Sequence, residues 1–321
     1  MNLKSVYDDM SAELLASSIS PEGVRLDTFK LRYWRAIHSE LMTHRQFSRN
    51  ASSSRAIPAS KLREKPVLYP EFRHNQRGMQ PGQPLSSDEQ EKAREIWSEA
   101  AEACLSAVEA LSAKDELNIH KQWPNRLLEW FTSIEVVVSS TDWENFWALR
   151  DHPDAQDEIR HLAGLMRQAY NHAEPVELDY GQWHLPFIRS EDDAAIKAFL
   201  EGQADALTRK NLYGEPAEDL LGQAAFAFSD LPDVTPEDQC RLVISAARCA
   251  RASYMNFRGD TAIEQDFQTF FKLAGSQPVH ATPLEHQAKP CRRVDGRYRS
   301  GNFWGWSQFR KFVPGEAVFD R

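Results

Sequence analysis

Long apolar runs are absent from this chain of 321 residues. No stretch approaches the roughly 20 consecutive apolar residues that a membrane-spanning helix needs. Residues 1–11 carry acids where a secretory signal would carry a basic and then an apolar stretch. We therefore expect a cytoplasmic protein without a membrane partner.

Cysteine is scarce, and the four thiols (Cys104, Cys240, Cys249 and Cys291) are far apart with no Cys-x-x-Cys pair. This spacing argues against a zinc knuckle and a dense disulfide frame, so we expect reduced thiols and no bound metal. Cys291 lies in a Lys-Pro-Cys-Arg-Arg run, where neighbouring cations would lower the pKa of its thiol. We favour the alternative, an ordinary loop cysteine.

Basic residues are fewer than acidic ones: the chain has 38 Lys and Arg and 47 Asp and Glu, which gives a net charge of -9. General binding to nucleic acid or to an anionic membrane needs a broad positive surface, so neither partner is expected. Any phosphate site must then be local. Apolar residues make up 41% of the chain, enough to fill a substantial core.

Hydrophobic periodicity indicates a helix-rich α+β protein, one domain with peripheral helices. We predict strands at 24–32 and 134–138, and helices at 33–47, 86–113, 125–130, 154–173, 191–203, 217–228 and 236–254, with a further helix after Thr141 or Asp142. The segment 46–70 loses the helical pattern and gathers Ser and Pro, so a loop is expected there and on through 78–84.

The most unusual stretch, 41–63, contains no acid although the chain as a whole is acidic. It reads Thr-His-Arg-Gln-Phe-Ser-Arg-Asn-Ala-Ser-Ser-Ser-Arg from Thr43 to Arg55. Guanidinium forks, hydroxyls and backbone N–H groups at a helix end followed by a tight loop can converge on one anion. The stretch is suited to a nucleotide phosphate. The alternative is a solvated basic loop.

The same stretch resembles a known signature. His44-Arg45, with Ser53 eight residues after Arg45 and then Arg55, is similar to the Arg-His-Arg-x7-Ser motif of the flavin-dependent thymidylate synthases. Ser48 also occurs commonly in that motif.

Two further blocks carry the resemblance. Asn145-Phe-Trp-Ala-Leu-Arg150, followed by Ala155-Gln-Asp-Glu-Ile159, is similar to the family's Asn-Phe-x-x-Leu-Arg and Ala-Gln-x-Glu-Ile. Ala250-Arg-Ala-Ser253, followed by His280-Ala-Thr-Pro-Leu-Glu-His286, is similar to Ala-Arg-x-Ser and His-x-Thr-Pro-Phe-Glu-His. Three matches make coincidence improbable.

The order of the blocks departs from the family, in which the Ala-Arg-x-Ser and Thr-Pro-x-Glu-His blocks come first. The chain therefore resembles a circular permutation, which preserves a fold when the old termini lie close together. We predict that the strand near Thr28 lies beside the segment that follows His286. The resemblance implies one permuted domain over 1–321 with a central, mainly antiparallel sheet. To this domain we expect two additions, an inserted loop and helix at about 64–118 and a basic aromatic tail at about 287–321 that is atypical of the family.

The resemblance also implies which residues form the site. The dUMP-binding positions would be Ser53, Arg55, Arg126 and Arg150, and the FAD-binding positions would be Thr43, His44, Arg45, Ser139, Asn145 and Thr282. Arg150 would be catalytic, because a fixed cation beside the pyrimidine N3 stabilises the ring anion. Its alternative role is a helix-surface ion pair with Asp151 or Asp154.

The family chemistry uses FAD, takes electrons from NADPH and takes a one-carbon unit from methylenetetrahydrofolate, and it needs no protein thiolate. Family members form homotetramers with active sites shared between subunits, which sets the expectation for assembly. Three positions depart from the pattern: Thr43 stands for an arginine, Glu40 for a frequent Gln and Ala51 for a common Glu. Arg49 or an arginine of the tail, with Trp304 or Trp306 stacked on a ring, could compensate.

Two alternatives remain open. One is a related enzyme that transfers a hydroxymethyl group to a pyrimidine deoxynucleotide, which product mass would distinguish. The other is a non-catalytic nucleotide- or RNA-binding protein that lost its flavin, for which the departures at Thr43 and Glu40 and the basic tail would argue. A purely structural role rests only on the amphipathic helices.

Overall fold

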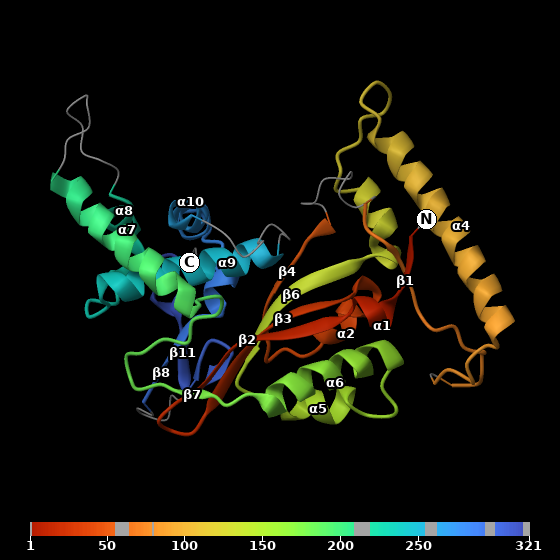
Figure 1. Ribbon diagram of the computed structural model, residues 1–321, viewed down its shortest axis with the longest axis horizontal. Coiled ribbons are helices and arrows are strands. Elements are labelled where there is room, and N and C mark those ends of the chain that lie inside the picture. Colours follow the sequence, from red (N-terminus) through yellow and green to blue (C-terminus); the bar gives the residue numbers. More distant parts are fainter. Residues whose placement is uncertain are drawn as a thin grey trace, which may run out of the picture.

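The computed structural model describes residues 2–54, 64–78, 80–208, 219–253, 262–292 and 299–316. At its centre is a five-stranded sheet with the strand order β4-β6-β3-β2-β7 (Figure 1). Its strands are β2 (Ser11–Ile19), β3 (Arg25–Trp34), β4 (Ser48–Ala51), β6 (Ser133–Ser140) and β7 (Val176–Glu177). Only the pairing of β2 with β7 is parallel. The α+β class with a mainly antiparallel central sheet is thus confirmed.

Strand β3 is the middle strand of this sheet. Its side chains alternate between apolar and polar over most of its length. Phe29, Leu31 and Tyr33 are fully buried on one face, while Lys30 and Arg32 point to the other. A period of two residues is what a strand between two different environments requires. The partner strands β2 and β6 pair with nearly all of β3, so β3 fixes the register of the sheet.

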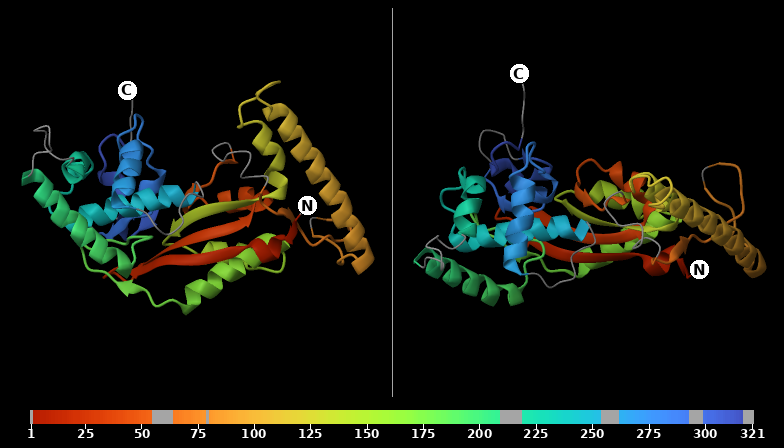
Figure 2. Two further views of the ribbon diagram at one scale, coloured as in Figure 1. Left: turned by 45° about the horizontal axis from the view of Figure 1, so that its top comes forward. Right: turned by 90° about the horizontal axis from the view of Figure 1, so that it is seen from above.

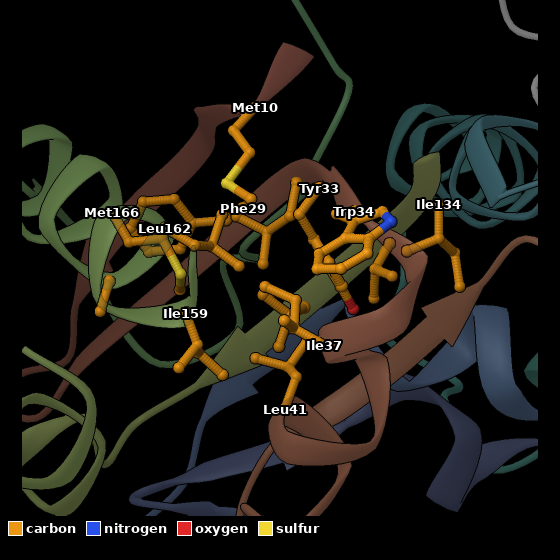
Figure 3. Close-up of a cluster of buried hydrophobic side chains, with 14 of the residues drawn as sticks. Met10, Phe29, Tyr33, Trp34, Ile37, Leu41, Ile134, Ile159, Leu162 and Met166 are labelled. Atoms are coloured by element: carbon orange, nitrogen blue, oxygen red, sulfur yellow. The ribbon is translucent and has the colours of Figure 1, made fainter. Parts of the chain in front are cut away.

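The main core lies between one face of the sheet and a helical layer (Figure 3). Helix α5 (Glu144–Arg150) and helix α6 (Asp157–His172) form this layer, and Leu162 and Met166 of α6 pack against Phe29. Each fully buried apolar side chain contributes about 1.5–3 kcal/mol to the free energy of unfolding. Burial of this face therefore stabilises the contact between the sheet and the helical layer.

The opposite face of the sheet meets helix α9 (Pro236–Ser253), whose Cys249 and Ala252 pack on Val137. Figure 1 and Figure 2 show further helices at both ends of the sheet. Those near α9 are α7 (Ser190–Thr208), α8 (Leu220–Ala224) and α10 (Ile263–Ala274), and the other end carries α4 (Ser87–Ser112) and the 3-10 helix η3 (Pro124–Phe131).

The predicted helix at 86–113 is confirmed as α4. Ser86 and Glu89 form a reciprocal capping box that satisfies the first backbone donors of the helix. The predictions at 125–130, 134–138, 154–173, 191–203 and 236–254, and the helix after Thr141 or Asp142, correspond to η3, β6, α6, α7, α9 and α5. In these elements the hydrophobic period of the sequence agrees with the tertiary packing.

The helix predicted over 33–47 is wrong for most of its length. Strand β3 continues to Trp34, because Tyr33 and Trp34 pair with β6 and bury their rings in the core. Only the 3-10 turn η1 (Arg35–Ile37) and the short helix α2 (His38–Met42) follow. Pairing with a neighbouring strand has overridden the helical period.

Other segments also differ from the predictions. The expected loop at 46–70 contains β4 and β5 (Val67–Tyr69), which pair with β6 and with β1 (Leu3–Ser5). The helix expected at 217–228 is the short α8 followed by the 3-10 helix η4 (Ala225–Phe228). Strand β2, the helix α10 and the four-residue α1 (Val6–Asp9) were not anticipated, because tertiary pairing and packing define them more than local pattern does.

The C-terminal tail is part of the core and not a solvated appendage. Its strands are β8 (Ala288–Pro290), β9 (Arg299–Ser300), β10 (Phe303–Trp304) and β11 (Trp306–Gln308), and β11 pairs with β8. Phe303, Trp306 and Phe309 are fully buried. The expectation that Trp306 could stack on a ligand ring is therefore wrong, whereas Trp304 is 44% exposed.

The predicted neighbourhood of Thr28 and the segment after His286 is confirmed. Leu26 of β3 shares an apolar cluster with Ala288 of β8 and Trp306 of β11. The Trp306 indole also donates to the Val24 carbonyl at 3.1 Å. The start of the central strand thus packs directly on the C-terminal segment.

We predict that Trp306→Ala lowers the free energy of unfolding by about 3–5 kcal/mol, because it removes a fully buried ring and a buried hydrogen-bond donor. Urea denaturation monitored by circular dichroism measures this. Trp304→Ala, two residues away, is the matched control and should cost less than about 1 kcal/mol. Equal effects of the two substitutions would contradict the packing of the tail.

Candidate functional site

The first signature block forms the turn between α2 and β4. Helix α2 ends at Met42, and the following turn runs through His44 before β4 begins at Ser48. Arg49 donates to the carbonyls of Met42 at 2.8 Å and His44 at 3.2 Å. These carbonyls lie at the C-terminal end of α2, where a cation is favourable. Arg49 therefore stabilises the turn and is not a substitute for the arginine missing at Thr43.

Arg150, the last residue of α5, joins this turn to the second block. Its guanidinium donates to Glu40 Oε2 at 2.9 Å, to His44 Nε2 at 3.0 Å and to Thr43 Oγ1 at 3.2 Å. The alternative of an ion pair with Asp151 or Asp154 is wrong, because the acidic partner is Glu40. Two of the three residues that depart from the family pattern thus hold the predicted catalytic arginine.

His44 is neutral in this arrangement. Its ring stacks on Phe47 at a centroid distance of 5.6 Å and meets the edge of Phe146 at 5.0 Å. Burial and, to a smaller extent, the nearby Arg150 and Arg49 guanidinium groups together lower the pKa of His44 to about 4. Because Nε2 accepts from Arg150, the single ring proton is on Nδ1.

A first cavity, of about 530 Å³, lies between the end of β4 and η3, and we call it the serine cavity. Its lining residues are Arg35, Ala36, His38, Ser39, Ala51, Ser52, Ser53, Ser54, Arg126, Glu129, Trp130 and Ile134. It therefore brings together Ser53 and Arg126, two of the predicted dUMP-binding residues.

The serine cavity carries two guanidinium groups and one carboxylate. Arg35 donates to the Ser52 carbonyl at 3.4 Å, and Ser54 donates to Glu129 at 2.5 Å. Burial lowers the pKa of His38 to about 4, so His38 adds no charge. Two cations against one carboxylate, with several hydroxyls, suit a phosphate-bearing ligand.

A second cavity, of about 860 Å³, includes Glu40 of α2 and Arg150 in its lining, and we call it the Arg150 cavity. Besides Arg150 its charged lining is Arg73 and the carboxylates of Glu40, Glu71, Asp154, Asp157 and Glu158. Five carboxylates against two guanidinium groups disfavour a phosphate. Arg150 is therefore separated, within one chain, from the cavity of Ser53 and Arg126.

The predicted insertion forms one wall of the Arg150 cavity. Residues 70–73 and 80–81 line it, and the Gln80 amide donates to the Asp154 carbonyl at 2.6 Å. Arg73 forms an ion pair with Asp157 at 3.0 Å. These contacts attach the insertion to the turn between α5 and α6, beside Arg150.

The third block packs against the first. Asn50 of β4 donates to the Cys249 carbonyl of α9 at 3.1 Å, and the 3-10 helix η5 (Thr282–Glu285) contacts β4. The tail connects them further, because Gln308 donates both to Ser48 Oγ at 2.7 Å and to the Glu285 carbonyl at 2.9 Å. Arg310 of the tail pairs with the Glu285 carboxylate. Arg310 therefore stabilises the contact between the tail and η5.

Ser139, a predicted FAD-binding residue, lies in a buried row of hydroxyl and imidazole groups. Its hydroxyl bonds to Thr28 Oγ1 at 2.6 Å and to His286 Nδ1 at 2.8 Å. His184 continues the row, with Nε2 2.8 Å from Thr28 and Nδ1 2.9 Å from Ser18 Oγ. All five side chains are at most 5% exposed. Ser139 therefore makes two contacts within the chain, far from solvent.

The six predicted FAD-binding residues do not lie together in one site of the chain but in several different places. Thr43 and His44 contact Arg150, and Ser139 is buried in the row. Arg45 and Asn145 are exposed, and their neighbours in the sequence, His44 and Phe146, are in ring contact. Thr282 is half-buried at the start of η5. Neither the serine cavity nor the Arg150 cavity is lined by Arg45, Asn145 or Thr282.

Arg55, the remaining predicted dUMP-binding residue, lies outside the described residues. Arg35, by contrast, lines the serine cavity without having been predicted. It lies directly after a strand and before a short helix, where a cation often meets a ligand, but the apparent helical period over 33–47 concealed that boundary. His184 was not predicted either, because it lies in an irregular segment.

The cysteines offer no nucleophile. All four thiols are free. Burial raises the pKa of Cys240 to about 12 and also raises the pKa of Cys249. The lowered pKa considered for Cys291 is wrong, because burial raises the pKa of that thiol as well.

Within the described ranges, no helix is both long and apolar enough to cross a membrane. In the same part of the chain, no three His, Cys, Asp or Glu side chains are grouped so that they could hold a metal ion.

Residues 27–176 match the family model described as "Thymidylate synthase complementing protein". The chain therefore carries a domain of this family. The matched range contains the first two blocks, Arg126 and Ser139, and leaves out the third block at 250–286. That division agrees with the unusual block order, and the circular permutation stays a prediction. No curated protein sequence matches the chain significantly.

Two solved structures illustrate what the fold is similar to. A UMP/dUMP methylase, PolB from Streptomyces cacaoi bound with 5-Br UMP, is 20% identical, with 53% of this chain and 91% of that chain covered and a TM-score of 0.44. Thymidylate synthase X from Helicobacter pylori with FAD and dUMP is 20% identical, with 45% and 67% covered and a TM-score of 0.31.

We predict that the free energy of unfolding falls as the pH is lowered from 7 to 5.5. Burial lowers the pKa of His184 and of His286 to about 3, so both stay neutral in the folded chain, whereas an unfolded histidine takes up a proton near pH 6.5. The unfolded state then binds more protons, and each histidine costs about 1.4 kcal/mol over this interval.

Urea unfolding at several pH values measures this slope. His172→Gln is the control, because His172 is exposed and its removal should leave the slope unchanged. A free energy of unfolding that is constant from pH 7 to 5.5 would show that the two buried rings are not neutral partners in the row.

Proposed function

We propose that this chain is a flavin-dependent pyrimidine nucleotide methylase that converts dUMP to dTMP, with methylenetetrahydrofolate as the one-carbon donor and NADPH as the reductant. The observation that carries the proposal is the serine cavity, in which Arg35, Arg126 and the serines at 52–54 converge within the family-matched range. A nucleotide phosphate needs this combination of guanidinium and hydroxyl donors.

The phosphate is assigned to the serine cavity because of charge. The Arg150 cavity carries an excess of carboxylates, which would repel a phosphate, whereas guanidinium groups predominate in the serine cavity. Arg126 and Ser53 would bind the phosphate, and the neutral His38 and the Trp130 side chain offer surfaces for the remainder of the nucleotide. Arg150 would act on the pyrimidine ring, where its fixed charge favours loss of the N3 proton.

FAD is proposed to bind at the surface where Arg45 and Asn145 are exposed, with Thr282 from the third block. Bound there, it would supply the redox chemistry of the methylation. The protein's own contribution is to position the donors: the His44 and Phe146 rings fix the spacing between the two exposed side chains.

A homotetramer is part of the proposal, because one chain leaves its candidate site divided. Arg150 and the pair of Ser53 and Arg126 line different cavities. An active site that uses all three requires that Arg150 from one copy meet the serine cavity of another, or that the substrate extend from one cavity to the other. Symmetric assemblies commonly place sites at their interfaces.

The decisive experiment is single-turnover chemistry. The purified chain, loaded with FAD and reduced anaerobically, is mixed with dUMP and methylenetetrahydrofolate, and the nucleotide is analysed by mass spectrometry. We expect the mass increment of a methyl group. A hydroxymethyl increment would favour the related transferase, and unchanged dUMP with retained flavin absorbance would refute the synthase while leaving a flavoprotein. Lack of flavin binding would refute both.

We predict that Arg126→Ala weakens dUMP binding by about tenfold to a hundredfold, since a hydrogen bond to a charged group contributes about 1.5–3 kcal/mol. Isothermal titration calorimetry measures the change. Deoxyuridine, which lacks the phosphate, should lose much less affinity. Arg160→Ala, another exposed arginine on a helix, is the control, and an equal loss in both variants would argue against a phosphate contact at Arg126.

A further inference from the structure

The guanidinium of Arg150 donates to an acceptor on each of three residues within one five-residue segment. Glu40 accepts from one terminal nitrogen, Thr43 from the other and His44 from Nε. The Arg150 and Glu40 side chains are 20% and 27% exposed. A fork held at all three of its nitrogens has a single orientation.

We propose that Glu40 and Thr43 are the positioning residues of Arg150, and that the Glu40 carboxylate limits how far Arg150 stabilises negative charge on a bound pyrimidine ring. The part that concerns the ring rests on the proposed function. The part that concerns the orientation of Arg150 depends only on the contacts within this chain.

The two positions are related through their shared partner. They are the places where this chain has Glu for a frequent Gln and Thr for an arginine. An arginine at position 43 would bring a second guanidinium against Arg150, and like charges at that distance repel. A threonine instead offers a small neutral acceptor, and its own hydroxyl donates to the Glu40 carbonyl at 2.7 Å. The residues at 40 and 43 are thus matched to each other and to Arg150.

The carboxylate also changes what Arg150 does chemically. An ion pair at 2.9 Å offsets much of the guanidinium charge seen by a third group nearby. A pyrimidine N3 anion placed beside Arg150 therefore gains less stabilisation than beside an arginine held by an amide. A glutamine at position 40 would keep an oxygen acceptor and remove the opposing charge.

Only a few side chains act on His44 and Glu40 within the part of the chain that the structure describes. Arg150 from α5 and Arg49 from β4 are the charged groups that act on His44, and Phe47 and Phe146 cover its ring. Arg150 and Glu158 of α6 act on Glu40, and burial raises the pKa of its carboxyl. His44 is therefore a local reporter of where the Arg150 guanidinium lies.

The first test follows the His44 imidazole by NMR through an acid titration. Arg150→Met should raise the pKa of His44 from about 4 towards its ordinary value, because a neighbouring cation is lost. The double variant Glu40→Ala, Thr43→Val should raise it as well, because Arg150 is no longer held. Glu40→Gln should not raise it, because the amide oxygen still holds the guanidinium.

Arg167→Met is the matched control. Arg167 pairs with Asp151, next to Arg150, and has no role in the pKa of His44. It should leave the titration of His44 unchanged. A wild-type titration curve in the double variant, with the fold intact by circular dichroism, would overturn the assignment of Glu40 and Thr43 as positioning residues.

The second test compares the affinities of the FAD-loaded protein for dUMP and for its 5-fluoro analogue, whose N3 proton is more acidic. In Glu40→Gln the preference for the fluoro analogue should increase by about tenfold, equivalent to one unit of N3 pKa. Arg150→Met should abolish the preference. An unchanged preference in Glu40→Gln would refute the role of the carboxylate charge.

The two tests separate the inference from the proposed function. If the wild-type protein binds neither nucleotide, the proposed function and the effect on the ring both fail. The titration of His44 still decides whether Glu40 and Thr43 position Arg150, because it requires no ligand.

Discussion

A row of buried hydroxyl and imidazole groups holds together segments of this chain that are far apart in the sequence. Ser18, Thr28 and Ser139 come from three adjacent strands, and His184 and His286 come from segments that follow in the chain after the matched domain. Each polar group is buried, so a lost partner leaves an unsatisfied group at a cost of about 1–3 kcal/mol. These hydrogen bonds hold the central strands of the sheet against the segments that contain His184 and His286.

The site depends on that arrangement. Because β4 and η5 are held together by Gln308 and the tail, the turn before β4 has a defined place, and Arg150 can meet it from α5. Helix α2, which precedes this turn, contributes residues to both an acid-rich cavity and one rich in guanidinium and hydroxyl groups. The difference in charge between the two cavities is what allows a phosphate to be assigned to one of them.

Local signals predicted several elements well. The capping box of Ser86 and Glu89, the β-branched run in β6 and the helical period of α6 each act within a few residues, and the structure retains them. They failed at 33–47, where two aromatic residues complete a strand. They also failed for β2, whose pairing with β3 and β7 is a property of the assembled sheet.

The sequence by itself determined the chemistry that is available: an acid-free stretch with arginine and serine, three blocks that resemble one family, and four cysteines without a Cys-x-x-Cys pair. Only the tertiary structure decided which of these groups meet. Glu40 and Arg150 are far apart in the chain, and Ser139 was predicted beside a cofactor but lies in the buried row. Contacts of this kind depend on how strands pair and helices pack, and no local pattern encodes them.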